Sequence, residues 1–166
     1  MPLRRRFAYP VLIGIALGVF LSIADSFVHW TATFARDSGL PSFNAPLPGS
    51  LLFYPGGAIL VEVVYRLLPI PLLLWLFTLV SRGRGQEIAF WALAALTSLI
   101  EPVQQDLPDF RAGTEIAVFL NFAGDYALNF TQAFMFRRYG FLTSIVVRVA
   151  FYLVWHVAYG NGICRC

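Results

Sequence analysis

A glutamate and an arginine lie four residues apart inside a long apolar segment, and this pair constrains the fold more than any other feature of the chain. Glu62 and Arg66 are the only charged residues in the 30-residue run from Leu51 to Val80. A charge at the centre of a bilayer-length helix costs about 2.5–3.5 kcal/mol on insertion scales, so it needs a partner or a function. The i, i+4 spacing places both side chains on one helical face, where they can neutralise each other. The pattern predicts a helical membrane protein with a polar interior.

Two further ladders of polar residues have the same four-residue spacing. One ladder consists of Asn121, Asp125 and Asn129, and the other consists of Arg148, Tyr152 and His156. Lipid offers no partner to such side chains, so we expect them to face the interior of the bundle. Together with the first pair they form the predicted structural polar core: Glu62, Arg66, Asn121, Asp125, Asn129, Arg148, Tyr152 and His156.

Composition supports this class of protein. Of the 166 residues, 58% are hydrophobic and 13% are charged, against roughly 45–50% and about 25% in soluble domains. The length fits one integral membrane domain, residues 1–166, whose main partner is the lipid bilayer. All twelve basic residues other than histidine are arginines, and the net charge is +3. Because there is no basic cluster, we expect no nucleic-acid partner.

The apolar segments predict an all-α, polytopic bundle of about five transmembrane helices. The predicted spans are Phe7–Val28, Leu51–Val80, Ile88–Glu101, Glu115–Phe136 and Phe141–Tyr159, with loops at His29–Ser50 and Pro102–Gly113. At about 1.5 Å per residue, a helix over 51–80 exceeds a hydrocarbon core of about 30 Å. Pro69 and Pro71 are expected to break it, and we favour one broken span over two crossings. An alternative for residues 1–24 is a cleaved signal peptide, with Ser22-Ile23-Ala24 as the cleavage site.

The distribution of arginines predicts the orientation. With the N-terminus inside, seven arginines fall on the cytoplasmic side and three fall outside, which satisfies the positive-inside rule. The inside set is Arg4, Arg5, Arg6, Arg82, Arg84, Arg137 and Arg138, and the outside set is Arg36, Arg111 and Arg165. We therefore predict an integral protein of a prokaryotic cytoplasmic membrane. Cys164 and Cys166 are too close to form an ordinary disulfide, and we expect an unstructured tail there.

The order of these motifs resembles the CPBP family, the CAAX-protease and bacteriocin-processing intramembrane metalloproteases. The stretch from Pro55 to Leu67 is similar to the family's first motif, a Glu-Glu pair followed by three residues and Arg. The turn Arg137-Arg138-Tyr139-Gly140 and the helix after it are similar to the last motif. The segment Thr97–Glu101 stands where the family has Phe-x-x-x-His. The resemblance covers about residues 56–160.

Most of the family's chemistry is replaced in this chain. The family's first glutamate, its general base, corresponds to Val61, whereas the second glutamate and the arginine correspond to Glu62 and Arg66. The middle-motif histidine corresponds to Glu101. In the last motif the histidine corresponds to Arg148 and the residue four positions later is Tyr152, so that only His156 keeps a histidine. The resemblance thus implies no metal ligands, and it predicts that Arg148 pairs with a carboxylate, Glu101 first and Asp125 as the alternative.

Three functions follow as hypotheses. The first is a CPBP-like pseudoenzyme without a cofactor, which scaffolds, binds or protects a membrane protein or peptide partner. The second is an active intramembrane metalloprotease with a rearranged site, in which Glu62, Arg66, Glu101 and His156 are catalytic and zinc is the cofactor. The third is a helix bundle that conducts protons or solutes through Glu62, Asp125 and Arg148. Exposure of Glu101 at the membrane surface, next to Pro102, is a further alternative, and whether the chain is an enzyme stays open.

Overall fold

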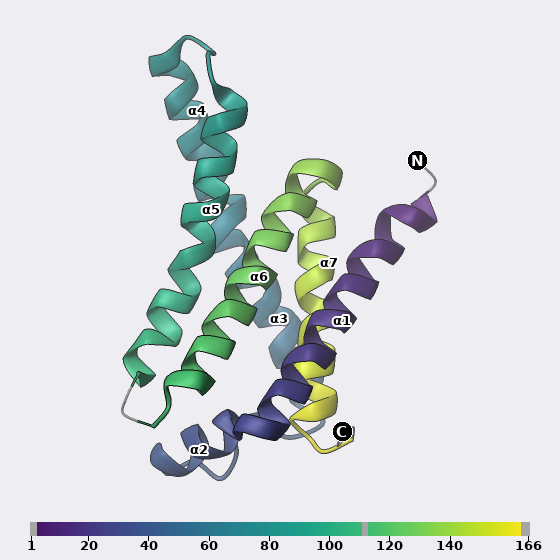
Figure 1. Ribbon diagram of the computed structural model, residues 1–166. Helices are drawn as coiled ribbons and strands as arrows, with labels where there is room; N and C mark the ends of the chain where they lie inside the picture. The colour runs from purple at the N-terminus through teal and green to yellow at the C-terminus, as the bar shows by residue number, and fades with distance from the viewer. Residues whose placement is uncertain (1–2, 111–112, 164–166) are drawn as a thin grey trace.

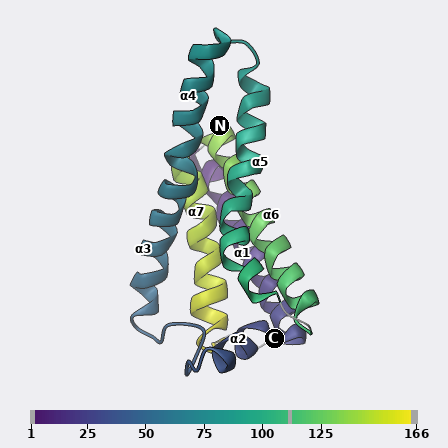
Figure 2. The same cartoon turned by 90° about the vertical axis from the view of Figure 1, so that its left-hand side faces the viewer.

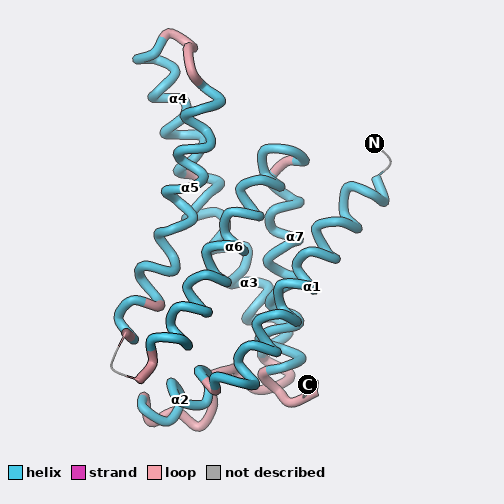
Figure 3. Tube along the Cα trace, viewed as in Figure 1, coloured by secondary structure: helices cyan, strands magenta, loops and turns pink. Residues whose placement is uncertain are grey.

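The computed structural model describes residues 3–110 and 113–163, and these residues form helices joined by short connections, with no β-strand among them (Figures 1 and 3). The α-helices are α1 (Leu3–Val28), α2 (Trp30–Asp37), α3 (Ser50–Glu62), α4 (Pro69–Ser81), α5 (Gln86–Gln105), α6 (Glu115–Tyr139) and α7 (Phe141–Tyr152). Two π-helical turns, η1 (Val63–Leu67) and η3 (Leu153–Tyr159), continue α3 and α7, and a 3-10 turn, η2 (Leu107–Asp109), follows α5. The all-α prediction is confirmed.

Three helical segments in the described part of the chain are long and apolar enough to cross a membrane. They are Arg6–Val28 with 23 residues, Ser50–Ser81 with 32 residues and Phe141–Tyr159 with 19 residues. These segments are compatible with an integral membrane protein. Polar and charged residues lower the hydropathy of α5 and α6, which are not among the three, so the five crossings stay a prediction.

The long helices run alternately between the two ends of the bundle. The segment α3–α4 rises from the end near α2, α5 returns, α6 rises again and α7 returns, so that α1 begins and α7 ends at opposite ends (Figure 1). The α4–α5 and α6–α7 turns lie at the end where α1 begins. Figure 2 shows that the α4–α5 hairpin extends beyond the other helices at this end. Arg82 and Arg84 lie in the α4–α5 turn, and Arg137 and Arg138 lie in the last turn of α6, at this same end.

The predicted loop at His29–Ser50 is wrong in its first part, because residues 30–37 form α2. Asp25 at the end of α1 explains this helix. Its carboxylate accepts hydrogen bonds from the backbone N–H of Thr31 at 2.9 Å and from the Thr31 hydroxyl at 2.5 Å. A carboxylate that binds the free N–H groups of a first turn stabilises the start of a helix. The chain turns between the two helices at His29, which has a positive φ of 52°.

The break predicted at Pro69 and Pro71 lies earlier in the chain and has another form. The helix loosens into the π-helical turn η1, and Pro69 then occupies the first turn of α4, where proline is tolerated. Leu68 donates its N–H to the carbonyl of Val63 at 3.0 Å, five residues back. Because proline lacks an N–H, it cannot bond to the carbonyl four residues before it. The wider turn accommodates this gap without ending the helix, so residues 50–81 form one continuous segment.

Small residues bring α1 close to its neighbours. α1 packs mainly against α7 and also against α6. A Cβ atom added at Gly14 would collide with the backbone of Val147, and one added at Gly18 would lie 2.8 Å from the Val154 Cβ. Glycines spaced by four residues allow such close contact between membrane helices. The main hydrophobic cluster lies next to this contact and consists of Leu21, Leu128, Met135, Val147, Phe151 and Trp155.

Candidate functional site

A buried ion pair between α5 and α7 is the first part of the candidate site. Arg148 donates from Nη1 to Glu101 Oε1 and from Nη2 to Glu101 Oε2, both at 2.7 Å. The side chains are 1% and 5% exposed, so the alternative of a surface-exposed Glu101 is wrong. A guanidinium that meets both oxygens of a carboxylate is the strongest form of this contact. The predicted pairing of Arg148 with Glu101 is therefore present, and Asp125 does not take its place.

The pair within the long apolar segment is also buried. Glu62 at the end of α3 and Arg66 in η1 are fully buried and hydrogen-bond to each other through Oε2 and Nη1. Gln132 of α6 donates to the same Glu62 oxygen at 2.8 Å. The neutralisation expected from the i, i+4 spacing is thus present. Glu62 Oε1 receives no hydrogen bond from the described residues.

Two amides of α6 join these ion pairs into one network. The side-chain oxygen of Asn129 accepts from Arg66 Nη2 and from Arg148 Nη2. The side-chain oxygen of Gln132 accepts from Arg148 Nε at 3.2 Å and from Nη2 at 3.0 Å. Two carboxylates and two guanidiniums thus meet in a net neutral core to which α3, η1, α5, α6 and α7 contribute. Buried charges are tolerated when they are paired and hydrogen-bonded in this way.

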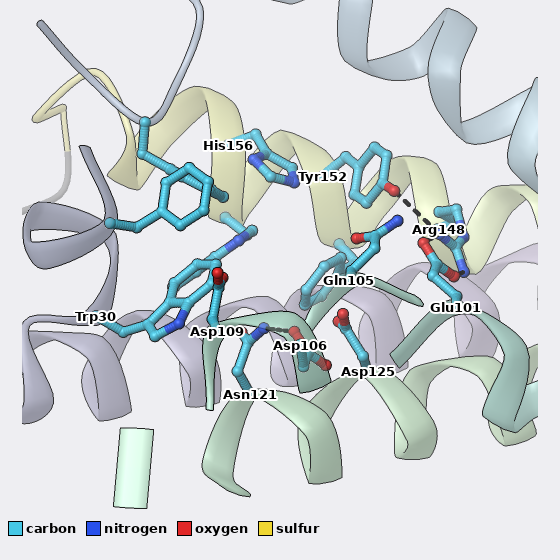
Figure 4. Close-up of a pocket in the computed structure, with 14 residues that line it drawn as sticks. Trp30, Glu101, Gln105, Asp106, Asp109, Asn121, Asp125, Arg148, Tyr152 and His156 are labelled. Carbon is cyan, nitrogen blue, oxygen red and sulfur yellow. Dashed lines mark hydrogen bonds and ion pairs between the residues drawn. The ribbon is translucent and has the colours of Figure 1, made fainter. Parts of the chain in front are cut away.

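A pocket of about 280 Å³ lies next to this network, at the end of the bundle covered by α2. Figure 4 shows Trp30 at one side of the pocket and Glu101 with Arg148 at the opposite side. The remaining lining residues come from α2, the loop after it, the end of α5, η2, α6, α7 and η3. They are Phe34, Phe43, Gln105, Asp106, Asp109, Asn121, Asp125, Phe151, Tyr152, Trp155 and His156.

Asp106 is a buried acid of this pocket. Its side chain is 1% exposed and accepts a hydrogen bond from Asn121 Nδ2 at 2.5 Å. The second carboxylate oxygen, Oδ2, has no hydrogen-bond partner among the described residues. Burial raises the pKa of Asp106 to about 6, and the neighbouring charges of Glu101 and Asp109 act in the same direction, whereas the Asn121 hydrogen bond opposes them.

His156 is held at the edge of the pocket by residues of the loop and of α3. Its Nδ1 lies 2.7 Å from the side-chain oxygen of Asn44. Its ring stacks on Tyr54 with 4.2 Å between the centroids and contacts the edge of Tyr152 at 4.7 Å. His156 does not join the hydrogen bonds of Arg148, since its Nδ1 pairs with Asn44 instead. Tyr152 does join the network, since its hydroxyl accepts from Arg148 Nη1 at 3.0 Å.

The structure divides the predicted polar core between the network and the pocket. Glu62, Arg66, Asn129, Arg148 and Tyr152 are brought together. Asn121, Asp125 and His156 instead line the pocket, and Asn121 hydrogen-bonds to the acid at the end of α5.

Several residues of the site were not predicted. Gln132 follows Asn129 by three positions on the same face of α6, so the helical period could have revealed it. Asn44 and Trp30 reach the site through the connection after α1. No periodic pattern links them to α6 or α7, so the sequence offered no signal for them.

The described residues do not fit the metal centre of a metalloprotease. No three His, Cys, Asp or Glu side chains within residues 3–110 and 113–163 are grouped so that they could hold a metal ion. Both oxygens of Glu101 are taken by Arg148. Comparisons with protein-family models, with curated proteins and with solved structures give no match to this chain.

Proposed function

We propose that this chain is a CPBP-like integral membrane protein that scaffolds, binds or protects a membrane protein or peptide and does not cleave peptide bonds. The observation that carries the proposal is the two-point contact between Arg148 and Glu101, at 2.7 Å for each hydrogen bond. The resemblance assigns these two positions to histidine ligands. An arginine cannot deprotonate to coordinate a metal, and its charge repels a divalent cation. In this proposal the salt bridge connects the helices that a metal connects in the family.

The contacts of the remaining residues support this function over an active protease. A rearranged centre would use Glu62, Glu101 and His156 around a zinc ion. Each of the three is engaged elsewhere: Glu62 with Arg66, Glu101 with Arg148, and His156 Nδ1 with Asn44. Freeing these groups would break a buried network, which is costly. A conducting pathway has less support, because Asp125 and Arg148 line the pocket whereas Glu62 is fully buried outside it.

Metal content and peptidase activity of the purified chain test the proposal. We expect no stoichiometric zinc by elemental analysis and no cleavage of peptide substrates. The matched control is Glu62→Gln, which should change neither readout. Zinc bound at about one equivalent, or a peptidase activity that Glu62→Gln abolishes, would support the protease instead.

A gain-of-site variant tests the correspondence with the family motifs. Arg148→His, Glu101→His and Val61→Glu together would place two imidazoles and a carboxylate on α7, α5 and α3. We expect zinc binding in this triple variant and none in Arg148→His alone, because a structural zinc needs several ligands at once. A folded triple variant that binds no zinc would argue against the correspondence.

A further inference from the structure

The pocket under α2 is rich in acidic side chains. Four carboxylates line it, and Arg148 is the one cationic residue among its lining residues. The terminal nitrogens of Arg148 are already bonded to Glu101. Asp106, Asp109 and Asp125 form no ion pair with any described residue. Three acids of the pocket thus have no cationic partner among the described residues.

A carboxylate oxygen without a hydrogen-bond donor indicates where a cationic group could bind in the pocket. Asp106 is 1% exposed, lines the pocket, and has one carboxylate oxygen without a hydrogen-bond donor in the described part of the chain. Asp125 lies beside it on α6 (Figure 4) and accepts no hydrogen bond from the described residues. A buried acceptor without a donor costs free energy, and a ligand with N–H groups would remove that cost.

Aromatic side chains also line the pocket, with Trp30 at the side away from Glu101 and Arg148 (Figure 4). Trp30 and Phe34 come from α2, Phe43 from the following loop, and Trp155 from η3. Trp30 and Phe43 pack edge to face with 4.9 Å between their ring centroids. Aromatic faces bind organic cations and apolar groups, whereas they do not ligate metal ions.

The volume of the pocket and the spacing of its carboxylates limit the class of ligand that it can bind. A volume of about 280 Å³ is at the lower end of the range for small-molecule sites, roughly 300–1,000 Å³. The carboxylates of the described residues are too dispersed to surround one metal ion, but a cation that carries an apolar group can contact both sides of the pocket.

We propose that this pocket binds a small organic ammonium ion whose charged group contacts Asp106 and Asp125 and whose apolar or aromatic group lies against Trp30 and Phe43. The inference rests on the binding role proposed above and gives it a chemical class. It does not use the correspondence with the CPBP motifs. The ligand enters at the α2 end of the bundle, opposite the arginine-rich turns.

Calorimetry with benzylamine tests this inference. The full chain is placed in lipid nanodiscs at neutral pH with a chelator, and empty nanodiscs correct for partitioning into lipid. We expect saturable binding of the benzylammonium ion. Benzyl alcohol has the same shape without the charge, and it should bind at least about tenfold more weakly because it cannot pair with a carboxylate. Equal affinity for the two compounds, or no saturable binding of benzylamine up to about 10 mM, would overturn the proposal.

Variants locate the site. Asp106→Asn keeps an oxygen for Asn121 and removes the charge, so we expect a folded protein whose affinity for benzylamine is at least about tenfold lower. Asp125→Asn should act in the same direction. Glu115→Gln is the matched control, because Glu115 is an exposed acid on α6 outside this pocket, and it should leave the affinity unchanged. Unchanged affinity in both asparagine variants would contradict the site.

A second ligand distinguishes an ammonium group on a free small molecule from one on a lysine side chain of a protein partner. N-acetyl-lysine methylamide represents the lysine side chain of a protein partner. If it binds at least about tenfold more tightly than benzylamine, the assignment to a free small molecule is overturned. The chelator keeps the test separate from the proposed function, since zinc found in the untreated protein would refute that function and leave the benzylamine result valid.

Discussion

At the scale of residues, two arginines share one acceptor. Arg66 and Arg148 both donate to the side-chain oxygen of Asn129, so two like charges lie close together in the core. They are tolerated there because each guanidinium also meets a carboxylate, Glu62 for one and Glu101 for the other. The network therefore depends on all of its members, and removal of one charge affects the others.

A double-mutant cycle measures this dependence. Arg148→Met and Glu101→Leu should each destabilise the protein by about 3–5 kcal/mol, because each leaves a buried charge unpaired. The double variant should be less destabilised than the sum of the two, since no lone charge remains at this pair. Thermal unfolding in detergent gives the comparison. Additive effects would show that the two side chains do not interact.

The raised pKa of Asp106 predicts that the stability of the protein depends on pH. Its pKa of about 6 in the folded protein lies above the value of about 3.9 expected in an unfolded chain. The folded state thus binds this proton more tightly, so the stabilisation is fully present below about pH 4 and is lost as the pH rises through 6. Glu101, Asp109, Asn121, Asp125 and Arg148 line the same pocket and are identical in the two proteins compared below.

Asp106→Asn isolates the contribution of this one group. The melting temperature of the unmodified protein should fall relative to that of the variant between pH 4 and pH 7, by about 3 °C or more, the change that roughly 1 kcal/mol gives at this chain length. A constant difference between the two proteins across this range would contradict the raised pKa of Asp106.

The site was predictable where its residues follow a helical period. The pair Glu62–Arg66 follows from spacing alone, and the partner of Arg148 followed from the resemblance and from opposite charges. Asn44 and Asp106 were missed because their roles depend on how the connections after α1 and α5 fold back over the helix ends. Such contacts join distant parts of the chain and leave no periodic trace in the sequence.

At the scale of elements, both π-helical turns hold a residue of the site. Arg66 lies in η1 and His156 lies in η3. π-helical turns often occur at functional sites, because the extra residue in the turn changes the direction of nearby side chains. The existence of the long helices was predicted from hydropathy. The π turn η1 and α2 were not, since they depend on local hydrogen bonds around a proline and an aspartate. The π turn η3 was not predicted either, and no proline or aspartate lies within it.

The contact between α1 and α7 gives a prediction at this scale. Gly14→Ala should destabilise the bundle, because the new Cβ would collide with the backbone of Val147 and one of the two helices would have to move away. Gly57→Ala on α3 is the matched control. Nothing lies within 4 Å of a Cβ at that position, and alanine favours a helix over glycine by about 1 kcal/mol.

Thermal unfolding of the two variants in the same detergent compares these outcomes. We expect a lower melting temperature for Gly14→Ala and an equal or higher one for Gly57→Ala. Equal behaviour of the two would show that the α1–α7 contact contributes little to stability.

At the scale of the whole molecule, charge differs between the two ends of the bundle. The turns α4–α5 and α6–α7 carry arginines, whereas the opposite end carries acids at the ends of α2 and α5, in η2 and at the start of α6. From the positive-inside rule we predict that the arginine end faces the cytoplasm and that the pocket under α2 faces outward. Orientation is thus a property of the whole chain that no single helix specifies.

Cysteine labelling tests this orientation. Cys164 and Cys166 lie outside the described residues and are first replaced by serine. Single cysteines are then placed at exposed positions, Ser38→Cys after α2 and Gln86→Cys at the start of α5. An impermeant maleimide should label the first in intact cells and the second only after permeabilisation. The reverse pattern would show that the N-terminus is outside.

The two ion pairs also differ in when they can form during biosynthesis. Glu62 and Arg66 are neighbours on one helical segment, so this segment can enter the lipid with its charges already neutralised. Glu101 and Arg148 are 47 residues apart, and Glu101 emerges from the ribosome before its partner exists. If α5 crosses the membrane as predicted from the sequence, we expect it to be stable in the bilayer only once α7 is present. A nascent chain that stops before Arg148 would then leave the Glu101 carboxylate without its partner.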